Sequence, residues 1–228
     1  MKNKNTIIGI VVAVIVAAVV ACIFIFSNNN NNNTTTNSNG NQENGNSNVS
    51  ENKDVDAIDN DDNYYVSING KKFKAGDKIS SLKEVGLKQQ DRVLSEKVKK
   101  NTYVIGAGTI ENAAGNRVIS LTPYNPTDDT ITVADAVIGG CDVGEYSYSK
   151  ISKDVLDLNI EVGGIKLGDS LEDVEKVFGK TDSVYTSESL GYKKYTYKSK
   201  KIYRSYEITI DKDGKVSQIY WKNLEFNK

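Results

Sequence analysis

The spacing of apolar and polar residues divides the chain into three stretches. Residues 7–26 are uncharged and nearly all apolar, residues 27–62 contain few apolar positions, and residues 63–228 mix short apolar runs with charged positions. Only the last stretch combines apolar side chains with helix or strand periodicity, as a hydrophobic core requires. We therefore expect the folded part to begin after residue 62.

The apolar run at 7–26 has the length of a transmembrane helix. At 1.5 Å per residue such a helix spans about 30 Å, the thickness of the hydrocarbon core of a bilayer. Lys2 and Lys4 precede the run, and no lysine or arginine follows before Lys53. The positive-inside rule then predicts a single-pass protein of the cell membrane, with a cytoplasmic N-terminus at 1–6 and an extracellular C-terminal region.

Two alternatives for this segment stay open. It could be a cleaved signal peptide, although such peptides have a shorter apolar region. Residues 19–22 also resemble a lipobox, in which Cys22 would be lipidated. The second cysteine, Cys141, cannot pair with Cys22 inside a bilayer, so no disulfide is expected and Cys141 is interpreted as a small buried residue.

Residues 27–62 are expected to form a disordered linker. Six asparagines stand at 28–33, and serine, threonine, glycine and further asparagines follow. This composition buries too little apolar surface to offset the entropy lost on ordering. The second half of the linker is rich in Asp and Glu, so it should be an acidic, flexible spacer.

The first half of the folded part opens with a hairpin pattern. An Asn69-Gly70 pair lies between the mostly apolar residues 64–68 and the Lys-Lys-Phe run at 71–73, and such pairs favour a two-residue β-turn. A helix ending at Gly86 should follow, and residues 88–100 suggest a second short helix. Strand-like runs rich in Val, Ile, Thr and Tyr come next, at 103–110, 117–124 and 130–138.

A strand, a turn and an amphipathic helix open the second half. Residues 158–162 alternate as a strand, Asp169 or Ser170 is the expected N-cap of the helix, and Gly179 should end it. Four further strands are expected at 183–187, 192–198, 203–211 and 215–223.

A weaker copy of this pattern lies 92 residues earlier. Matching positions include Lys74, Gly76, Asp77 and Val85 with Lys166, Gly168, Asp169 and Val177. The doubling predicts an α+β fold of two tandem repeats, each a short amphipathic helix packed on an antiparallel sheet. The first, divergent repeat would cover 63–150 and the second 151–228.

Composition excludes several kinds of chemistry. The chain has no histidine, so imidazole metal sites and nucleophile–histidine catalytic systems are excluded. Its net charge is −1, and only a small excess of basic groups remains after residue 62, too little to indicate nucleic acid. No sequence motif indicates a cofactor.

The segment 192–206 is the best candidate for a binding surface, because tyrosines alternate there with lysines. Tyrosine offers a large amphipathic contact area, and the basic residues could meet an anionic partner. The residues singled out are Tyr192, Lys193, Lys194, Tyr195, Tyr197, Tyr203 and Arg204. The simpler interpretation, which the pattern favours, is a hairpin with tyrosines partly in the core and lysines in water or protecting an edge.

Paired carboxylates offer a second reading, as an envelope hydrolase. Two carboxylates suffice for glycoside hydrolysis, and Asp169 with Asp173 or Asp128 with Asp129 are candidates. Helix capping and the helix dipole explain the first pair better, and turn formation explains the second. Residues 211–214 are interpreted as a turn, since the twelfth position of a calcium loop would be Lys222.

The second half of the folded part resembles the BamE-type (SmpA/OmlA) small envelope lipoproteins. The residues that carry the resemblance are 165–170, 173–174, 178–182, 206–210, 213–216 and 219. The β-lactamase-inhibitor-protein (BLIP) fold is similar and contains two tandem copies. The resemblance implies a non-enzymatic, protein-binding role.

The sequence therefore predicts a non-catalytic, extracytoplasmic protein-binding module tethered to the membrane through residues 7–26. Its partner would be another envelope or secreted protein. The alternatives are the envelope hydrolase and a binder of wall polymer or anionic lipid through residues 192–206.

Overall fold

Strands make up most of the regular structure in the computed structural model, which describes residues 56–105, 108–144 and 153–225. The described residues are 44% strand and 19% helix.

The elements of the first half are α2 (Asp56–Asp59), η1 (Asp61–Asn63), β1 (Tyr65–Ile68), β2 (Lys71–Lys74), η2 (Ile79–Val85), β3 (Lys88–Gln89), η3 (Asp91–Val93), β4 (Lys97–Val98), β5 (Thr102–Tyr103), β6 (Gly108–Glu111), β7 (Arg117–Asn125), β8 (Ile131–Thr132), η4 (Val133–Asp135) and β9 (Val137–Gly144). Those of the second half are α3 (Lys153–Leu156), β10 (Ile160–Val162), α4 (Leu171–Phe178), β11 (Val184–Ser187), β12 (Tyr192–Lys198), β13 (Arg204–Ile210) and β14 (Val216–Asn223). The η elements are short 3₁₀ helices.

A small three-stranded sheet joins the two halves of the chain. Its order is β10-β1-β2, and β1 pairs antiparallel with both neighbours. The β1–β2 hairpin turns at Asn69 and Gly70, whose φ angles are 51° and 84°. Two positive φ values are the signature of the turn that an Asn-Gly pair favours, so this hairpin is confirmed.

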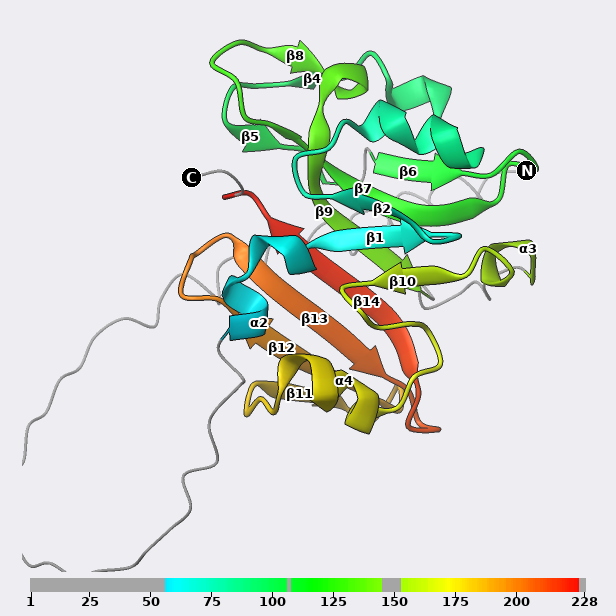
Figure 1. The fold of residues 1–228 in the computed structure, drawn as a ribbon, viewed down its shortest axis with the longest axis vertical. Helices are drawn as coiled ribbons and strands as arrows, with labels where there is room; N and C mark the ends of the chain where they lie inside the picture. The colour runs from blue at the N-terminus through cyan, green and yellow to red at the C-terminus, as the bar shows by residue number, and fades with distance from the viewer. Residues whose placement is uncertain (1–55, 106–107, 145–152, 226–228) are drawn as a thin grey trace, which may run out of the picture. The chain divides into compact units, whose positions relative to one another are not determined.

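The large sheet corrects the predicted fold class. In the described residues it has nine strands, in the order β11-β12-β13-β14-β9-β7-β6-β3, with β5 also paired to β7 (Figure 1). The last strand, β14, pairs directly with β9 of the first half, for example Trp221 with Cys141. The prediction of two tandem repeats, each a helix packed on its own sheet, is therefore wrong, because the strands of both halves form one sheet.

What is duplicated is a local turn. The Asp77 carboxylate accepts a hydrogen bond from the Lys74 backbone N–H at 2.8 Å, and Asp169 accepts one from Lys166 at 2.8 Å. In each turn the carboxylate satisfies the backbone of the residue three positions before it.

Both turns dock on a strand of the large sheet in the same way. The N–H of Gly76 donates to the Ile138 carbonyl at 2.8 Å, and that of Gly168 donates to the Val216 carbonyl at 2.8 Å. The glycines have φ angles of 93° and 88°, a conformation that other residues rarely adopt. The sequence doubling thus reflects two equivalent attachments to one sheet, at β9 and at β14.

The helices that follow the two turns differ because their caps differ. Ser170 is the N-cap of α4 and forms a capping box with Asp173, whereas Lys78 before η2 makes no side-chain cap. Two serines at 80–81 also lower the helix propensity of the first copy. Only the second copy is an α-helix. Residues 88–100, expected to be helical, form β3, η3 and β4 instead.

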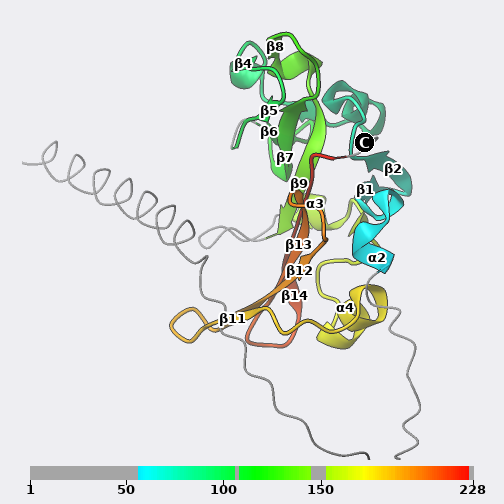
Figure 2. The same ribbon diagram turned by 90° about the vertical axis from the view of Figure 1, so that its left-hand side faces the viewer.

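One hydrophobic core spans both halves. It contains Phe73 and Ile119 of the first half together with Phe178 and Ile219 of the second. Figure 2 shows the large sheet nearly edge-on, with α2, α4 and the β1–β2 hairpin all on one of its sides. Cys141 lies in this core and is 1% exposed, as expected.

The predicted membrane location needs correction. No helix among the described residues is long and apolar enough to cross a membrane. Residues 7–26, Cys22 and most of the expected linker lie outside the described residues, so neither the anchor nor the extracellular location is supported. At the end of that linker, residues 56–62 form α2 and η1 rather than a spacer.

Candidate functional site

The side of the large sheet opposite the helices is polar and is the candidate site; we call it the open face. Successive side chains of a strand point to opposite sides. In β13, Tyr206 and Ile208 are buried in the core, whereas Glu207 between them is half-buried on the other side. The same alternation in β14 sends Trp221 into the core and Tyr220 to the open face.

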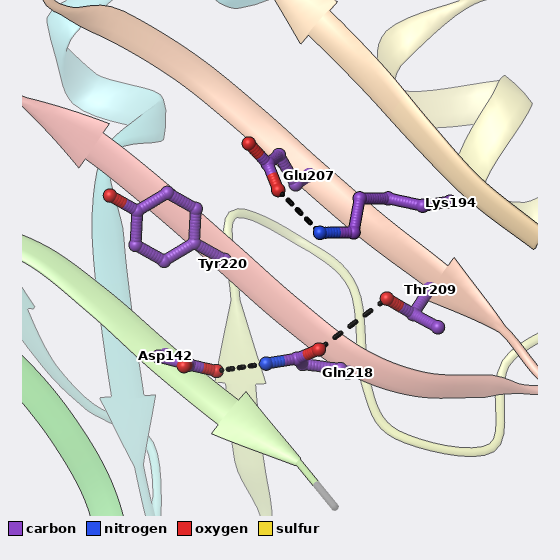
Figure 3. Close-up of a pocket in the computed structure, with 6 residues that line it drawn as sticks. All are labelled: Asp142, Lys194, Glu207, Thr209, Gln218 and Tyr220. Atoms are coloured by element: carbon purple, nitrogen blue, oxygen red, sulfur yellow. Dashed lines mark hydrogen bonds and ion pairs between the residues drawn. The ribbon is translucent and has the colours of Figure 1, made fainter. Parts of the chain in front are cut away.

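A shallow hollow of about 220 Å³, here called the polar basin, lies on the open face (Figure 3). It is lined by Asp142, Lys194, Glu207, Thr209, Gln218 and Tyr220, from β9, β12, β13 and β14. Register explains the convergence, since Lys194 stands opposite Thr209 and Tyr220 opposite both Glu207 and Asp142. The basin therefore depends on the pairing of β9 with β14.

The basin is a hydrogen-bonded network with opposite charges side by side. Lys194 donates to Glu207 at 3.0 Å, and the Gln218 amide donates to Asp142 at 2.9 Å. The side chains of Lys194 and Glu207 are 36% and 35% exposed, so solvent and a partner can both reach them. An ammonium has three donors and a carboxylate several acceptor positions, so this ion pair can bind a further polar group.

Tyr220 presents a hydroxyl group that stays protonated. Burial raises the pKa of Tyr220 above its ordinary value, and the neighbouring Glu207, Tyr103 and Asp142 raise it further. Within the described residues this hydroxyl takes part in no hydrogen bond. It is therefore a free donor beside two carboxylates.

An aromatic cleft of about 260 Å³ lies on the same face, next to the polar basin. It is lined by Asn101, Thr102, Tyr103, Tyr124, Tyr203 and Leu224. Lys222 lies close to both hollows: it is two residues from Tyr220 on β14, and its ammonium lies 5.8 Å from the centre of the Tyr103 ring. The cleft thus combines strands of both halves.

Gly139 permits the walls of the cleft to come together. A Cβ atom at this position would lie 2.6 Å from a methyl group of Leu224 and 2.7 Å from the Cβ of Tyr124. Any other residue would push these two side chains apart.

The structure separates the seven residues that the sequence singled out. Lys194 lies in the polar basin and Tyr203 in the aromatic cleft. Tyr192, Lys193 and Tyr195 line a third hollow of about 400 Å³ beside Leu171. Two of these five residues therefore lie in separate hollows of the open face, and the other three line a different hollow.

Tyr197 and Arg204 are structural. The Tyr197 ring packs 5.3 Å from that of Phe178, and burial raises the pKa of Tyr197 to about 12. The Arg204 side chain is 1% exposed and forms an ion pair with Asp61. Neither side chain can contact a partner.

Sequence reasoning missed Asp142, Gln218, Tyr220 and Tyr103. Only Gln218 and Tyr220 have a signal in the sequence, because both lie on β14, where they alternate with the buried Ile219 and Trp221. That signal indicates a solvent-facing side, but it does not distinguish a binding face from an ordinary exposed one.

The paired carboxylates proposed for a hydrolase have other functions in the structure. Asp173 belongs to the capping box and also binds Lys176, and Asp169 accepts the Lys166 N–H. Asp128 and Asp129 are exposed in the bend between β7 and β8. In the part of the chain that the structure describes, no group of three or more Cys, Asp or Glu could hold a metal ion.

Comparison of the chain with family models, with curated proteins and with solved structures finds no match. The resemblance to BamE-type and BLIP-like proteins therefore stays a prediction.

Proposed function

We propose that this chain is a non-catalytic protein-binding module and that the open face is its contact surface. The observation that carries the proposal is the closeness of the aromatic cleft to the polar basin: Tyr103 of the cleft lies near Tyr220 of the basin and 5.8 Å from the Lys222 ammonium. Energetically important contacts in protein interfaces are enriched in tyrosine and combine buried aromatic anchors with satisfied polar groups. The open face offers both within a few residues.

The size of the polar basin and of the aromatic cleft favours a protein over a small ligand on the open face. Pockets for small molecules usually have volumes of about 300–1,000 Å³ and enclose most of the ligand. The basin and the cleft are smaller, about 220 and 260 Å³, and both are open to solvent. Each fits one or two side chains of a partner.

An anionic polymer or lipid has less support. Within the hairpin, Lys194 is paired with Glu207, and Lys193 stands on the other side of the sheet. The lysines thus do not form one positive surface, which electrostatic binding to a polyanion needs.

Photocrosslinking in the native cells tests the proposal. Tyr220 is replaced by p-benzoyl-phenylalanine, and the control carries it at Glu172, exposed on α4 across the sheet. We expect the Tyr220 variant to crosslink to one protein and the Glu172 variant not to do so. With that protein purified, Tyr220→Ala should weaken binding by about 2 kcal/mol, as at other interface hot spots.

Two results would contradict the proposal. One is identical crosslinking from both faces, because specific binding would then not involve the open face. The other is hydrolysis of a peptide or glycan that is lost in Glu207→Gln, because the polar basin would then be catalytic.

A further inference from the structure

The strand β11 ends the large sheet, and its outer edge has no partner among the described residues. Its inner edge pairs with β12 in continuous register, from Val184–Tyr195 to Ser187–Tyr192. A strand in this position offers its outward backbone groups to another chain.

Hydrogen-bond alternation shows which groups point outward. The Thr196 N–H donates to the Ser183 carbonyl at 2.9 Å, so Ser183 bonds to β12. In an antiparallel pair every second residue does so, which leaves Val184 and Thr186 facing away from β12. The Val184 N–H bonds to the Asp182 carbonyl at 3.0 Å. One donor, the Thr186 N–H, and two acceptors, the carbonyls of Val184 and Thr186, remain for an incoming strand.

This edge lacks the usual protection against pairing. Natural edge strands carry lysine, proline or a bulge, and β11 has none of these over its four residues. Its apolar side chains are exposed instead, Val184 by 42% and Tyr185 by 59%. The Tyr185 ring lies 6.3 Å from that of Tyr192, so a tyrosine pair borders the edge.

The charges at the ends of β11 decide what can bind. Asp182 and Glu188 flank the strand, both exposed, and neither forms an ion pair within the described residues. Two copies of β11 paired antiparallel about Tyr185 would place Asp182 of one opposite Glu188 of the other. Like charges in opposing positions are destabilising, so a second copy of this chain fits poorly in this register.

We propose that β11 binds an extended peptide segment of a partner protein by strand addition. The segment has β-branched or aromatic residues at its centre and a lysine or arginine at each end, opposite Asp182 and Glu188. Main-chain hydrogen bonds hold the segment, and the two carboxylates select its flanking charges. This site goes beyond the proposed function, because it uses the sheet edge and not the open face.

The test titrates the full chain with a blocked peptide, Gly-Arg-Thr-Val-Tyr-Val-Thr-Arg-Gly, followed by calorimetry. Thr186→Pro removes the outward N–H without touching the bonds to β12, and should weaken binding about tenfold or more. Thr186→Ala is the matched control, because it keeps the N–H and should bind nearly as well as the parent. Circular dichroism confirms that both variants are folded.

Charge reversal gives a second readout that does not depend on proline. The variant Asp182→Lys/Glu188→Lys should lose the arginine-flanked peptide and bind its glutamate-flanked counterpart instead. Tyr220→Ala should leave peptide binding unchanged, which separates this site from the open face.

Three outcomes would overturn the proposal: no peptide binding at millimolar concentration, equal binding by Thr186→Pro and Thr186→Ala, or unchanged peptide preference after charge reversal. A concentration-dependent dimer that Thr186→Pro dissolves, without peptide binding, would assign the edge to a second copy.

Discussion

Arg204, the first residue of β13, holds the start of the folded part against the large sheet. Its guanidinium donates to the Asp59 carbonyl at 2.9 Å and to the Asp61 carboxylate, and it lies 5.8 Å from the Tyr64 ring. The amide of Asn223 donates to the same carboxylate at 3.0 Å. An acidic segment expected to be a spacer is thus ordered by one buried cation.

Replacing this cation should be costly. Arg204→Met removes the charge, leaves the half-exposed Asp61 carboxylate with the Asn223 amide as its remaining donor and deprives the Asp59 carbonyl of its donor, so we expect the free energy of unfolding to fall by about 2 kcal/mol. Urea titration followed by the fluorescence of Trp221, the single tryptophan, measures the change. Lys198→Met, at an exposed position of the adjacent strand, should change stability by less than about 0.5 kcal/mol. Equal effects of the two variants would show that the ion pair does not anchor the segment.

The spacing of tyrosines in the sequence does not predict which of them face the core and which face the candidate site. Tyr197 and Tyr195 alternate with lysines as residues of a binding face would, yet Tyr197 is in the core and Tyr195 packs against it. Tyrosine is suited to both environments, so its spacing does not distinguish them. Tyr220 was missed for the converse reason, since its neighbours Asp142 and Glu207 come from other strands.

At the scale of the element, the hydrogen bonds of its first turn stabilise α4 as an α-helix. Ser170 accepts the Asp173 N–H at 3.2 Å, and Asp173 accepts the Ser170 N–H at 3.1 Å. Ser170→Ala should therefore destabilise the fold by about 1 kcal/mol, measurable by urea titration. Thr196→Ala, on the open face of β12, is a control that leaves the helix untouched. No difference between the variants would mean that packing alone holds α4.

The same cap predicts a dependence on pH. Hydrogen bonds from the Ser170 side chain and backbone, with Lys176, lower the pKa of Asp173 from 3.8 to about 2. Because the pKa is lower in the folded state, the stabilisation is complete above the unfolded value and is lost as pH falls from about 4 to about 2. The stability difference between the parent chain and Asp173→Asn should shrink over this interval. A difference independent of pH would show that the carboxylate charge has no part in it.

The elements whose turn or cap residues lie within a few positions of one another could be predicted from the sequence. The β1–β2 hairpin and α4 each carry their turn or cap within a few positions, and strands β11 to β14 alternate clearly. The first helix failed because Lys78 provides no side-chain cap, so the apolar spacing of Ile79 and Leu82 was satisfied by a 3₁₀ helix. Periodicity alone does not distinguish these two helices over two turns.

At the scale of the whole molecule, pairing between distant strands could not be derived from the sequence. The pairing of β9 with β14 joins the two halves in one sheet, and the sequence of neither strand indicates which strand it pairs with. The repeated turn suggested two units, each with its own sheet. It instead marks two attachment points on one sheet.

The single sheet predicts that the halves cannot fold separately. A fragment of residues 56–144 would lack one of the two partner strands of β1 and one of the two of β9, and a fragment of residues 153–228 would expose the β14 edge and half of the core. Neither fragment should show a cooperative thermal transition by circular dichroism, whereas residues 56–228 should. Cooperative unfolding of the second fragment alone would restore the tandem-repeat interpretation.

The junction between the small and the large sheet also sets the order of events during synthesis. Ile68 of β1 can pair only after Ile160 of β10 has been synthesised. Asp61 can accept its hydrogen bond from Asn223 only after a further 162 residues. Contacts at such sequence distances slow folding, because long loops must close before the contacts form. The nascent N-terminal half therefore leaves the ribosome with strand edges that find their partners only when translation is nearly complete.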